Sequence, residues 1–250
     1  MGDLTPESWY RAFVYMNPVV TASLVALVEV AAVRGAQRPS GGVLATIDHL
    51  VYAAPSLQEG VEGIERLLGV RASPGGQHLG RGTRNALLAL GPDTYLEIIA
   101  PDPEQPRPAE PRWFGIDALQ EPRLVTWAAK GTSLDQLFLD AEVRGVRLGA
   151  VTSSSRTQSN GVRLTWLYTD PRTVVADGVV PFFIDWGPTQ HPSRSAPRGA
   201  SLLDLRAEHP NPEYARQTLS RLGLDLEVRE GPRAALIARI SGLRGVVELR

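Results

Sequence analysis

The sequence predicts an α+β protein that is built from repeated βαβββ modules, and two observations lead to this prediction. From residue 46 onward, the chain shows a strand, a helix and further strands in three successive passes. Each predicted helix ends at a glycine, and these glycines, Gly69, Gly145 and Gly223, lie 76 and 78 residues apart. Such regular spacing favours internal duplication over chance.

The first module carries the clearest signals. An apolar strand at 46–54 is followed by a helix that Ser56 opens, with Glu59 three residues later as in a capping box. Apolar residues at helical spacing predict one buried face, and Gly69 predicts the end of this helix. Strands at 83–90 and 94–100 follow, joined by a turn at 91–93.

The later modules repeat these signals. The second is predicted to have a strand at 124–128, a helix that begins at Thr132 or Ser133, and strands at 162–168 and 181–186. The third is predicted to have a strand at 202–207, a helix capped by Asn211 with Pro212 in its first turn, and a last strand at 246–249.

Alignment of the modules relates particular side chains to one another. Aligning the first strands places Asp204 on His49, and aligning the last strands places Glu248 on Glu97. The third module therefore has a polar side chain that could bind a metal or form a hydrogen bond at each of these two positions.

Composition excludes several classes of function. The 26 basic and 27 acidic residues give a formal net charge of −1, so a nucleic-acid partner is not expected. Lys130 is the only lysine, which removes amine chemistry from nearly every position. Cysteine is absent, which excludes disulfides and thiolate nucleophiles. Gly-rich phosphate loops, GxSxG elbows and His-Glu-x-x-His motifs are also absent.

Residues 1–43 are expected to form an N-terminal extension outside the modules. An amphipathic helix at 12–33 precedes a Gly-rich linker, whose composition is typical of poorly ordered segments. Asn17 and Glu29 interrupt the apolar run, and Asp3 and Glu7 stand where a signal peptide has basic residues, so we expect a cytoplasmic protein without a membrane partner. Two modules are then assigned to 44–198 and the third, packed on them, to 199–250.

His49 and Glu97 are the leading candidates for a functional site. Glu97 lies in the apolar strand 94–100, and a buried carboxylate requires a metal, a hydrogen-bond partner or a raised pKa. Its alternative is a solvated position on an edge strand. His49 is interpreted as a metal ligand, a hydrogen-bonding residue of a pocket, or a buried structural histidine.

Further polar residues are candidates for binding a substrate. Segment 75–85 is either a polar loop that covers a pocket and binds an anionic group, or an ordinary hairpin. Arg156, in the serine-rich segment 153–161, is either an anion-binding or a solvated residue. Trp186 is either a core residue or a platform for a ligand. The substrate-binding candidates are His78, Arg84, Asn85, Arg156 and Trp186.

Several motifs resemble the glyoxalase-like branch of the vicinal oxygen chelate superfamily. They are Ile-Asp-His-Leu-Val-Tyr-Ala at 47–53, the segments 77–87, 95–98 and 155–161, and Pro-Phe-Phe-Ile-Asp-Trp-Gly at 181–187 before His191 and Pro192. The resemblance covers about 46–250. It implies that the βαβββ modules form curved mixed sheets around a central pocket.

The resemblance also implies a metal centre, because metal-dependent members take ligands from the first and last strands of two paired modules. His49 and Glu97 would be one half of the set, for a divalent Zn, Mn, Fe, Ni or Co ion, and Glu97 would also move a proton as the catalytic residue. Leu124 stands where a further ligand is expected, so the second module offers at most Asp185. Pairing of the third module with the first would instead supply Asp204 and Glu248.

The function implied is that of a lyase, isomerase or dioxygenase-type enzyme acting on a small oxygenated substrate. The alternative is a metal-free protein that binds or sequesters a small molecule, of the bleomycin-resistance type. A third interpretation treats the modules as a scaffold for a homodimer.

Overall fold

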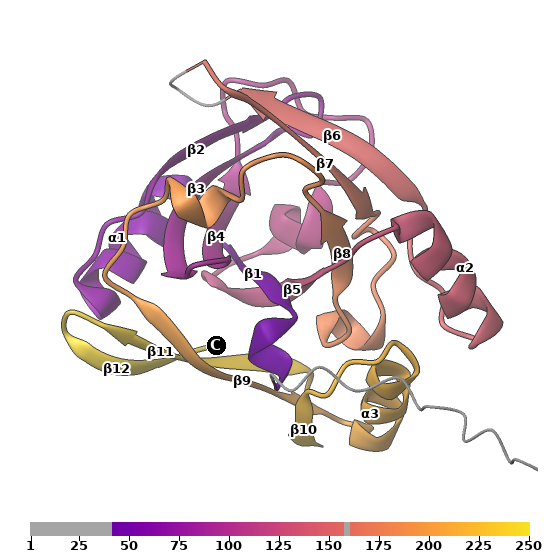
Figure 1. The fold of residues 1–250 in the computed structure, drawn as a ribbon. Helices are drawn as coiled ribbons and strands as arrows, with labels where there is room; N and C mark the ends of the chain where they lie inside the picture. Colours follow the sequence, from indigo (N-terminus) through magenta and orange to yellow (C-terminus); the bar gives the residue numbers. More distant parts are fainter. Residues whose placement is uncertain (1–41, 158–160) are drawn as a thin grey trace, which may run out of the picture. The chain divides into compact units, whose positions relative to one another are not determined.

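The computed structural model describes residues 42–157 and 161–250, which all belong to one compact unit, Arg38–Arg250. The predicted N-terminal helix at 12–33 and nearly all of the linker after it lie outside the described residues. The described residues form an eight-stranded sheet and a four-stranded sheet (Figure 1). None of their helices is long and apolar enough to cross a membrane.

Two βαβββ modules with the same strand order build the eight-stranded sheet, whose order is β2-β3-β4-β1-β5-β8-β7-β6. The first module comprises β1 (Ile47–Ala53), α1 (Leu57–Leu68), β2 (Ser73–His78), β3 (Thr83–Gly91) and β4 (Thr94–Pro101). The second comprises β5 (Arg123–Lys130), α2 (Leu134–Val143), β6 (Val151–Thr157), β7 (Arg163–Thr169) and β8 (Phe182–Asp185). The first strands β1 and β5 pair antiparallel at the centre, which confirms the predicted fold class.

The predicted signals at the ends of α1 have their expected physical roles. The Ser56 side chain accepts a hydrogen bond from the Glu59 amide, and Gly69 ends the helix in the left-handed region at φ 76°. Val61, Ile64 and Leu68 on one face are buried in the core. The helix is thereby fixed on the outer side of the strands that carry the site.

The third pass has the predicted sequence of elements but a different strand order. It comprises β9 (Ser201–His209), α3 (Pro212–Arg221), β10 (Glu227–Glu230), β11 (Ala235–Gly242) and β12 (Gly245–Leu249), in the order β10-β9-β11-β12. Because β12 pairs with β11 and not with β9, Glu248 does not stand beside Asp204 as Glu97 stands beside His49. Arg206 instead pairs with both acids, so the third module does not complete a site with the first.

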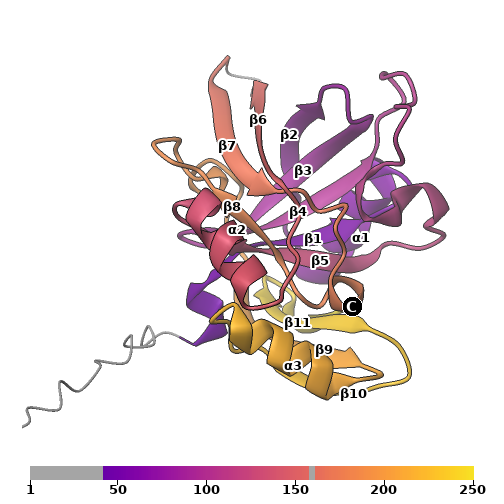
Figure 2. The same cartoon turned by 90° about the vertical axis from the view of Figure 1, so that its right-hand side faces the viewer.

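One hydrophobic core joins the two sheets. Leu50 and Trp127 of the eight-stranded sheet belong to the same buried cluster as Leu205 and Ala238 of the four-stranded sheet. The Leu124 amide also donates a hydrogen bond to the Arg250 carbonyl. The views in Figures 1 and 2 show β9, β11 and α3 along one side of the larger sheet. The opposite face of that sheet is left for the pocket.

The eight-stranded sheet curves until its two edge strands approach each other. β2 and β6 are the ends of the hydrogen-bonded order, yet they come into contact and lie side by side in both views (Figures 1 and 2). The described residues also contain four short 3₁₀ turns: η1 (Val43–Ala45), η2 (Trp113–Ala118), η3 (Ala176–Gly178) and η4 (Pro192–Arg194). The concave face of the sheet therefore encloses a central space.

Candidate functional site

His49 and Glu97 meet in a pocket because their strands are neighbours. β1 and β4 run parallel, with His49 opposite Tyr95 and Val51 opposite Glu97, and residues two apart on a strand share a face. The His49 Nε2 lies 3.7 Å from the Glu97 Oε2, and both side chains are almost fully buried. The pair stands in the pocket that the family resemblance implies.

Asn85 connects Glu97 to the far edge of the sheet. Its Nδ2 donates a hydrogen bond of 2.6 Å to the Glu97 Oε1, and its Oδ1 accepts one of 3.2 Å from the Arg156 Nη1. Asn85 lies on β3 and Arg156 on β6, so the Asn85 amide links the two modules through hydrogen bonds. A buried carboxylate, an amide and a buried guanidinium therefore form one chain of hydrogen bonds.

His78 completes the polar wall. Its Nδ1 is 3.0 Å from the Thr83 Oγ1, and its Nε2 is 3.3 Å from the Asn85 Nδ2 and 3.8 Å from the Glu97 Oε1. Burial, the largest influence, lowers the pKa of His78 below its usual value, with the nearby Glu97 acting in the opposite direction. Burial therefore favours the uncharged form of the His78 imidazole.

Aromatic side chains form the rest of the pocket. The His49 ring stacks on Tyr95 with centroids 4.6 Å apart, and burial, followed by the nearby Asp48 and Glu97, raises the pKa of Tyr95 well above its usual value. The cavity has a volume of about 50 Å³. The remaining aromatic residues that line it are Trp113, Phe114, Trp166, Tyr168 and Trp186.

The structure places most of the predicted site residues in this pocket. His49, Glu97, His78, Asn85, Arg156 and Trp186 all line it. Segment 75–85 is the β2–β3 hairpin and not a covering loop. Two of the predicted residues, Asp185 and Arg84, do not line the pocket.

Strand alternation explains both differences. On β8, Ile184 lines the pocket, so the adjacent Asp185 faces the other side, where its Oδ1 accepts a hydrogen bond from the Gly187 amide. On β3, Asn85 lines the pocket, and the adjacent Arg84 faces away. Neither side chain can therefore reach a ligand held between His49 and Glu97.

Some residues of the site were not predicted as functional. Trp166 and Tyr168 stand two apart on β7, and this alternation is the sequence signal that could have identified them. Trp113 and Phe114 lie in η2, where Phe114 has φ 63°, a conformation that a bulky residue rarely adopts. His191, which the sequence analysis did not place in the site, lies 3.1 Å from the Asp48 carboxylate.

The donor set does not fit the four-ligand metal centre that the resemblance implies. Across the β1–β5 pair, the residue opposite His49 is Ala128, while Leu124 lies opposite Tyr52 and packs in the core. The pocket residue of β8 is Ile184. The second module thus presents no ligand, and within residues 42–157 and 161–250 no three His, Asp or Glu residues are arranged to hold a metal ion.

The buried Arg156 weighs further against a divalent cation. Its guanidinium stands next to Asn85 and carries a permanent positive charge where an adjacent metal ion would be repelled. The polar wall offers instead a buried guanidinium, which can donate hydrogen bonds to an anionic or carbonyl oxygen, and a buried carboxylate on Glu97.

Comparison with solved structures shows the same fold in a distant protein. A hypothetical protein from Staphylococcus aureus is similar at a TM-score of 0.55 and 13% identity, over 81% of this chain and 83% of that chain. Methylmalonyl-CoA epimerase from Mycobacterium tuberculosis is similar at a TM-score of 0.40 and 22% identity, over 60% of this chain and 93% of that chain. A hypothetical protein from Bacillus halodurans is similar at a TM-score of 0.39 and 18% identity, over 58% of this chain and 96% of that chain. No curated protein matches the chain.

The comparison with models of protein families shows which family the chain belongs to. The family model that matches is described as a glyoxalase-like domain, and it spans residues 47–223, from β1 of the first module to the end of α3. This range includes both modules and every residue of the pocket. The chain belongs to the glyoxalase-like domain family.

Proposed function

We propose that the protein is a small-molecule enzyme of the isomerase or lyase type, in which Glu97 transfers a proton on a small oxygenated substrate without a metal ion. The observation that carries this proposal is the buried Glu97 carboxylate, anchored through one oxygen by Asn85 and faced by His49 across 3.7 Å. A buried, oriented carboxylate in a pocket is a suitable general base.

Asn85 supports the role of Glu97 by orienting it. The Asn85 Nδ2 holds the Oε1, and the Oε2 is the oxygen nearer to His49. Fixing one oxygen limits rotation of the carboxylate, so the other is presented in a defined direction. A proton acceptor that is held in place loses less entropy when the substrate binds.

Arg156 supports the binding of an oxygen atom that gains negative charge. When Glu97 takes a proton from a carbon next to a carbonyl group, the electron pair of the C–H bond moves to the carbonyl oxygen. The buried Arg156 guanidinium, on the same wall through Asn85, can stabilise that oxygen. Return of the proton to carbon completes an isomerisation, and loss of an adjacent group completes an elimination.

The size of the cavity limits the substrate. The cavity has a volume of about 50 Å³ and is lined by aromatic side chains, so it suits a compact reacting group. Small 2-oxo carboxylates have the required C–H next to a ketone carbonyl, small 2-hydroxy carboxylates have it next to the carboxylate, and both carry the anionic charge.

The second candidate is a binding protein without turnover. The observation that favours it is the aromatic lining, in which Trp113, Trp166 and Trp186 surround the polar wall. Aromatic walls bind planar ligands through stacking and burial, and this requires no proton transfer.

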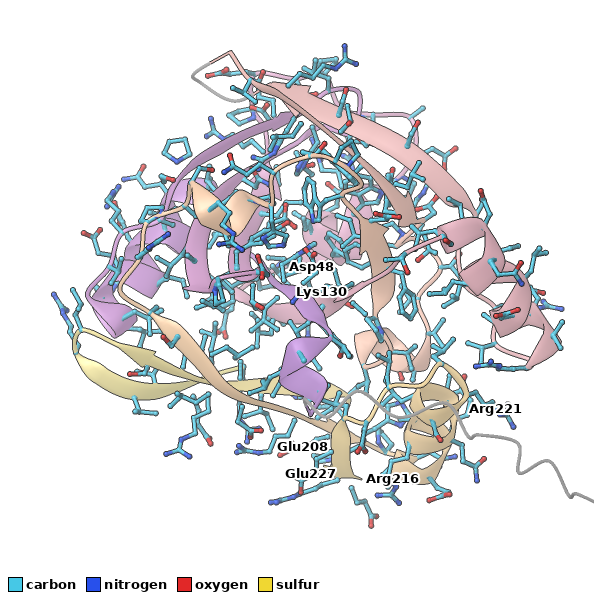
Figure 3. All side chains as sticks on the ribbon, in the orientation of Figure 1. Asp48, Lys130, Glu208, Arg216, Arg221 and Glu227 are labelled. Atoms are coloured by element: carbon cyan, nitrogen blue, oxygen red, sulfur yellow. The ribbon has the colours of Figure 1, made fainter. Side chains whose placement is uncertain are left out.

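Proton exchange in D₂O distinguishes the two candidates. Pyruvate, 2-oxobutyrate and lactate would be incubated with the full chain in the presence of EDTA. Deuterium incorporation would be followed by NMR at the carbon next to the ketone carbonyl of the two 2-oxo acids and at the hydroxyl-bearing carbon of lactate, which is next to its carboxylate. Enzyme-catalysed exchange that Glu97→Gln lowers at least 100-fold supports the proposal. The matched control is Glu227→Gln, on β10 and away from Asp48 in Figure 3.

The other outcomes contradict the proposal in distinct ways. Exchange that persists in Glu97→Gln excludes Glu97 as the base. Exchange that appears only when Zn²⁺, Mn²⁺ or Ni²⁺ replaces EDTA overturns the metal-independent mechanism. Saturable binding by calorimetry without exchange of any of the three probes supports the binding protein instead.

A further inference from the structure

Asp48 is a buried carboxylate that receives hydrogen bonds from three separate parts of the chain. Its oxygens lie 2.8 Å from the His49 Nδ1, 3.1 Å from the His191 Nε2 and 3.1 Å from the Trp186 Nε1. His49 is on β1, Trp186 directly follows β8, and His191 precedes η4. Asp48 is only 1% exposed and lies inside the ribbon in Figure 3.

These contacts keep Asp48 ionised. Burial alone would raise its pKa, but hydrogen bonds from His191 and His49, together with their electrostatic attraction, lower the pKa to about 2. An ionised carboxylate accepts hydrogen bonds and cannot donate them. Each nitrogen that contacts Asp48 must therefore carry the hydrogen.

We propose that Asp48 is a positioning residue that holds His49 as the tautomer with hydrogen on Nδ1, so that the lone pair of Nε2 faces Glu97. The proposal rests on the proposed function, because it deepens the role of the same site. It assigns the tautomer from the partners of the ring, as a carboxylate does for a neighbouring imidazole.

The orientation of the ring is fixed independently of its tautomer. Tyr95 stacks on one face with an interplanar angle of 19°, and Phe182 meets the ring edge-on at 5.6 Å. These two contacts prevent the imidazole from turning over without disturbing the packing. The remaining choice is which nitrogen carries the hydrogen, and Asp48 makes that choice.

The tautomer determines what the pocket recognises. With hydrogen on Nδ1, the His49 Nε2 and the Glu97 Oε2 are two acceptors 3.7 Å apart. A ligand that places an O–H or an acidic C–H between them satisfies both. With hydrogen on Nε2, His49 would instead donate toward Glu97 and compete with the substrate for its carboxylate.

His191 provides an internal comparison of opposite sign. Its Nδ1 accepts a hydrogen bond from the Ser193 backbone amide, and its Nε2 faces the same Asp48 carboxylate. We therefore expect hydrogen on Nε2 in His191 and on Nδ1 in His49.

Long-range ¹H–¹⁵N NMR of the full chain tests the assignment, since the protein contains only 4 histidines. The spectra would be recorded without ligand at a pH where the imidazoles are neutral, and assigned by replacing each histidine in turn with glutamine. The expected pattern for His49 is opposite to that of His191. Hydrogen on the His49 Nε2 in the wild-type protein overturns the proposal, and this reading needs no variant at position 48.

Asp48→Asn tests the cause of the tautomer. The asparagine amide group points a donor at one of its partners, so His49 or His191 is expected to change tautomer in the folded variant. Retention of both wild-type tautomers would overturn the role of Asp48. The matched control, Asp185→Asn, changes an aspartate that contacts the Gly187 amide outside the pocket and should leave both tautomers unchanged.

The kinetic readout separates this proposal from the proposed function. If the wild-type protein catalyses proton exchange, Asp48→Asn should lower kcat at least 10-fold with KM changed less than threefold. An unchanged kcat in a variant with an altered His49 tautomer would refute the catalytic relevance of the tautomer. If wild-type exchange is absent but the tautomers are as expected, the proposed function fails and the assignment of Asp48 stands.

Discussion

Replacement of Gly75 by alanine should disturb the polar wall of the pocket directly. A Cβ at this position on β2 would lie 2.5 Å from the Arg156 Nη1 and closer still to the Asn85 Oδ1. Since 3.4 Å is the lower limit of ordinary contact, the guanidinium would have to move by about 0.9 Å. Both groups are buried, so neither can move into solvent.

The expected cost follows from the contacts that are lost. Overpacking of a buried site costs about 2 kcal/mol. Weakening the charge-assisted hydrogen bond from Asn85 to Glu97 costs about 2 kcal/mol more. Replacing glycine restricts the unfolded chain and returns about 1 kcal/mol. Gly75→Ala should therefore lower the free energy of unfolding by about 3 kcal/mol.

Urea unfolding followed by tryptophan fluorescence measures this difference. The matched control is Gly91→Ala at the end of β3, where a Cβ would meet Thr94 at an ordinary 3.7 Å. Only the effect on the unfolded chain remains there, so this variant should be more stable than the wild-type protein by up to about 1 kcal/mol. Equal stability of Gly75→Ala and the wild-type protein would show that Asn85 and Arg156 do not pack against β2 as described.

Two further perturbations test the helix start and the buried carboxylate. Ser56→Ala removes the acceptor for the Glu59 amide and should lower the free energy of unfolding by about 1 kcal/mol in urea titrations; no change would contradict a capping role. The folded-state pKa of Asp48, about 2, lies below the unfolded value of 3.8, so its stabilisation is present above pH 4 and is lost as the pH falls through 2. Asp48→Asn should therefore lose about 2 kcal/mol less stability than the wild-type protein between pH 5 and pH 2, and parallel losses would refute the lowered pKa.

Local chemistry explains why much of the first module could be predicted. Ser56, Glu59 and Gly69 act through contacts within a few residues of each other, so their pattern in the sequence already contains the interaction. His49 and Glu97 were identifiable because each is a polar side chain within an otherwise apolar strand. Their adjacency required only that β1 and β4 pair, which the βαβββ pattern implies.

The rest of the site depends on register and on long-range contacts. Ile184 and Asp185 are neighbours on the four-residue strand β8, and its pairing with β5 and β7 decides which of them faces the pocket. Such a short strand has no alternation long enough to reveal its buried face. The strand order of the third module is likewise set by pairing. His191 reaches Asp48 across more than a hundred residues, and no local pattern signals that contact.

The edge strands β2 and β6 come into contact beside the pocket without forming a pair in the sheet. The two strands are not partners in the hydrogen-bonded order, and the bond from the Arg156 Nη1 to the Asn85 Oδ1 crosses between their modules. Separation of β2 from β6 would break side-chain contacts and leave the strand pairing within the eight-stranded sheet intact, so this edge is where the sheet would open at the lowest cost in backbone hydrogen bonds. A ligand that accepts a hydrogen bond from Arg156 in place of Asn85 would replace the side-chain contact between the two modules with its own contact as it enters.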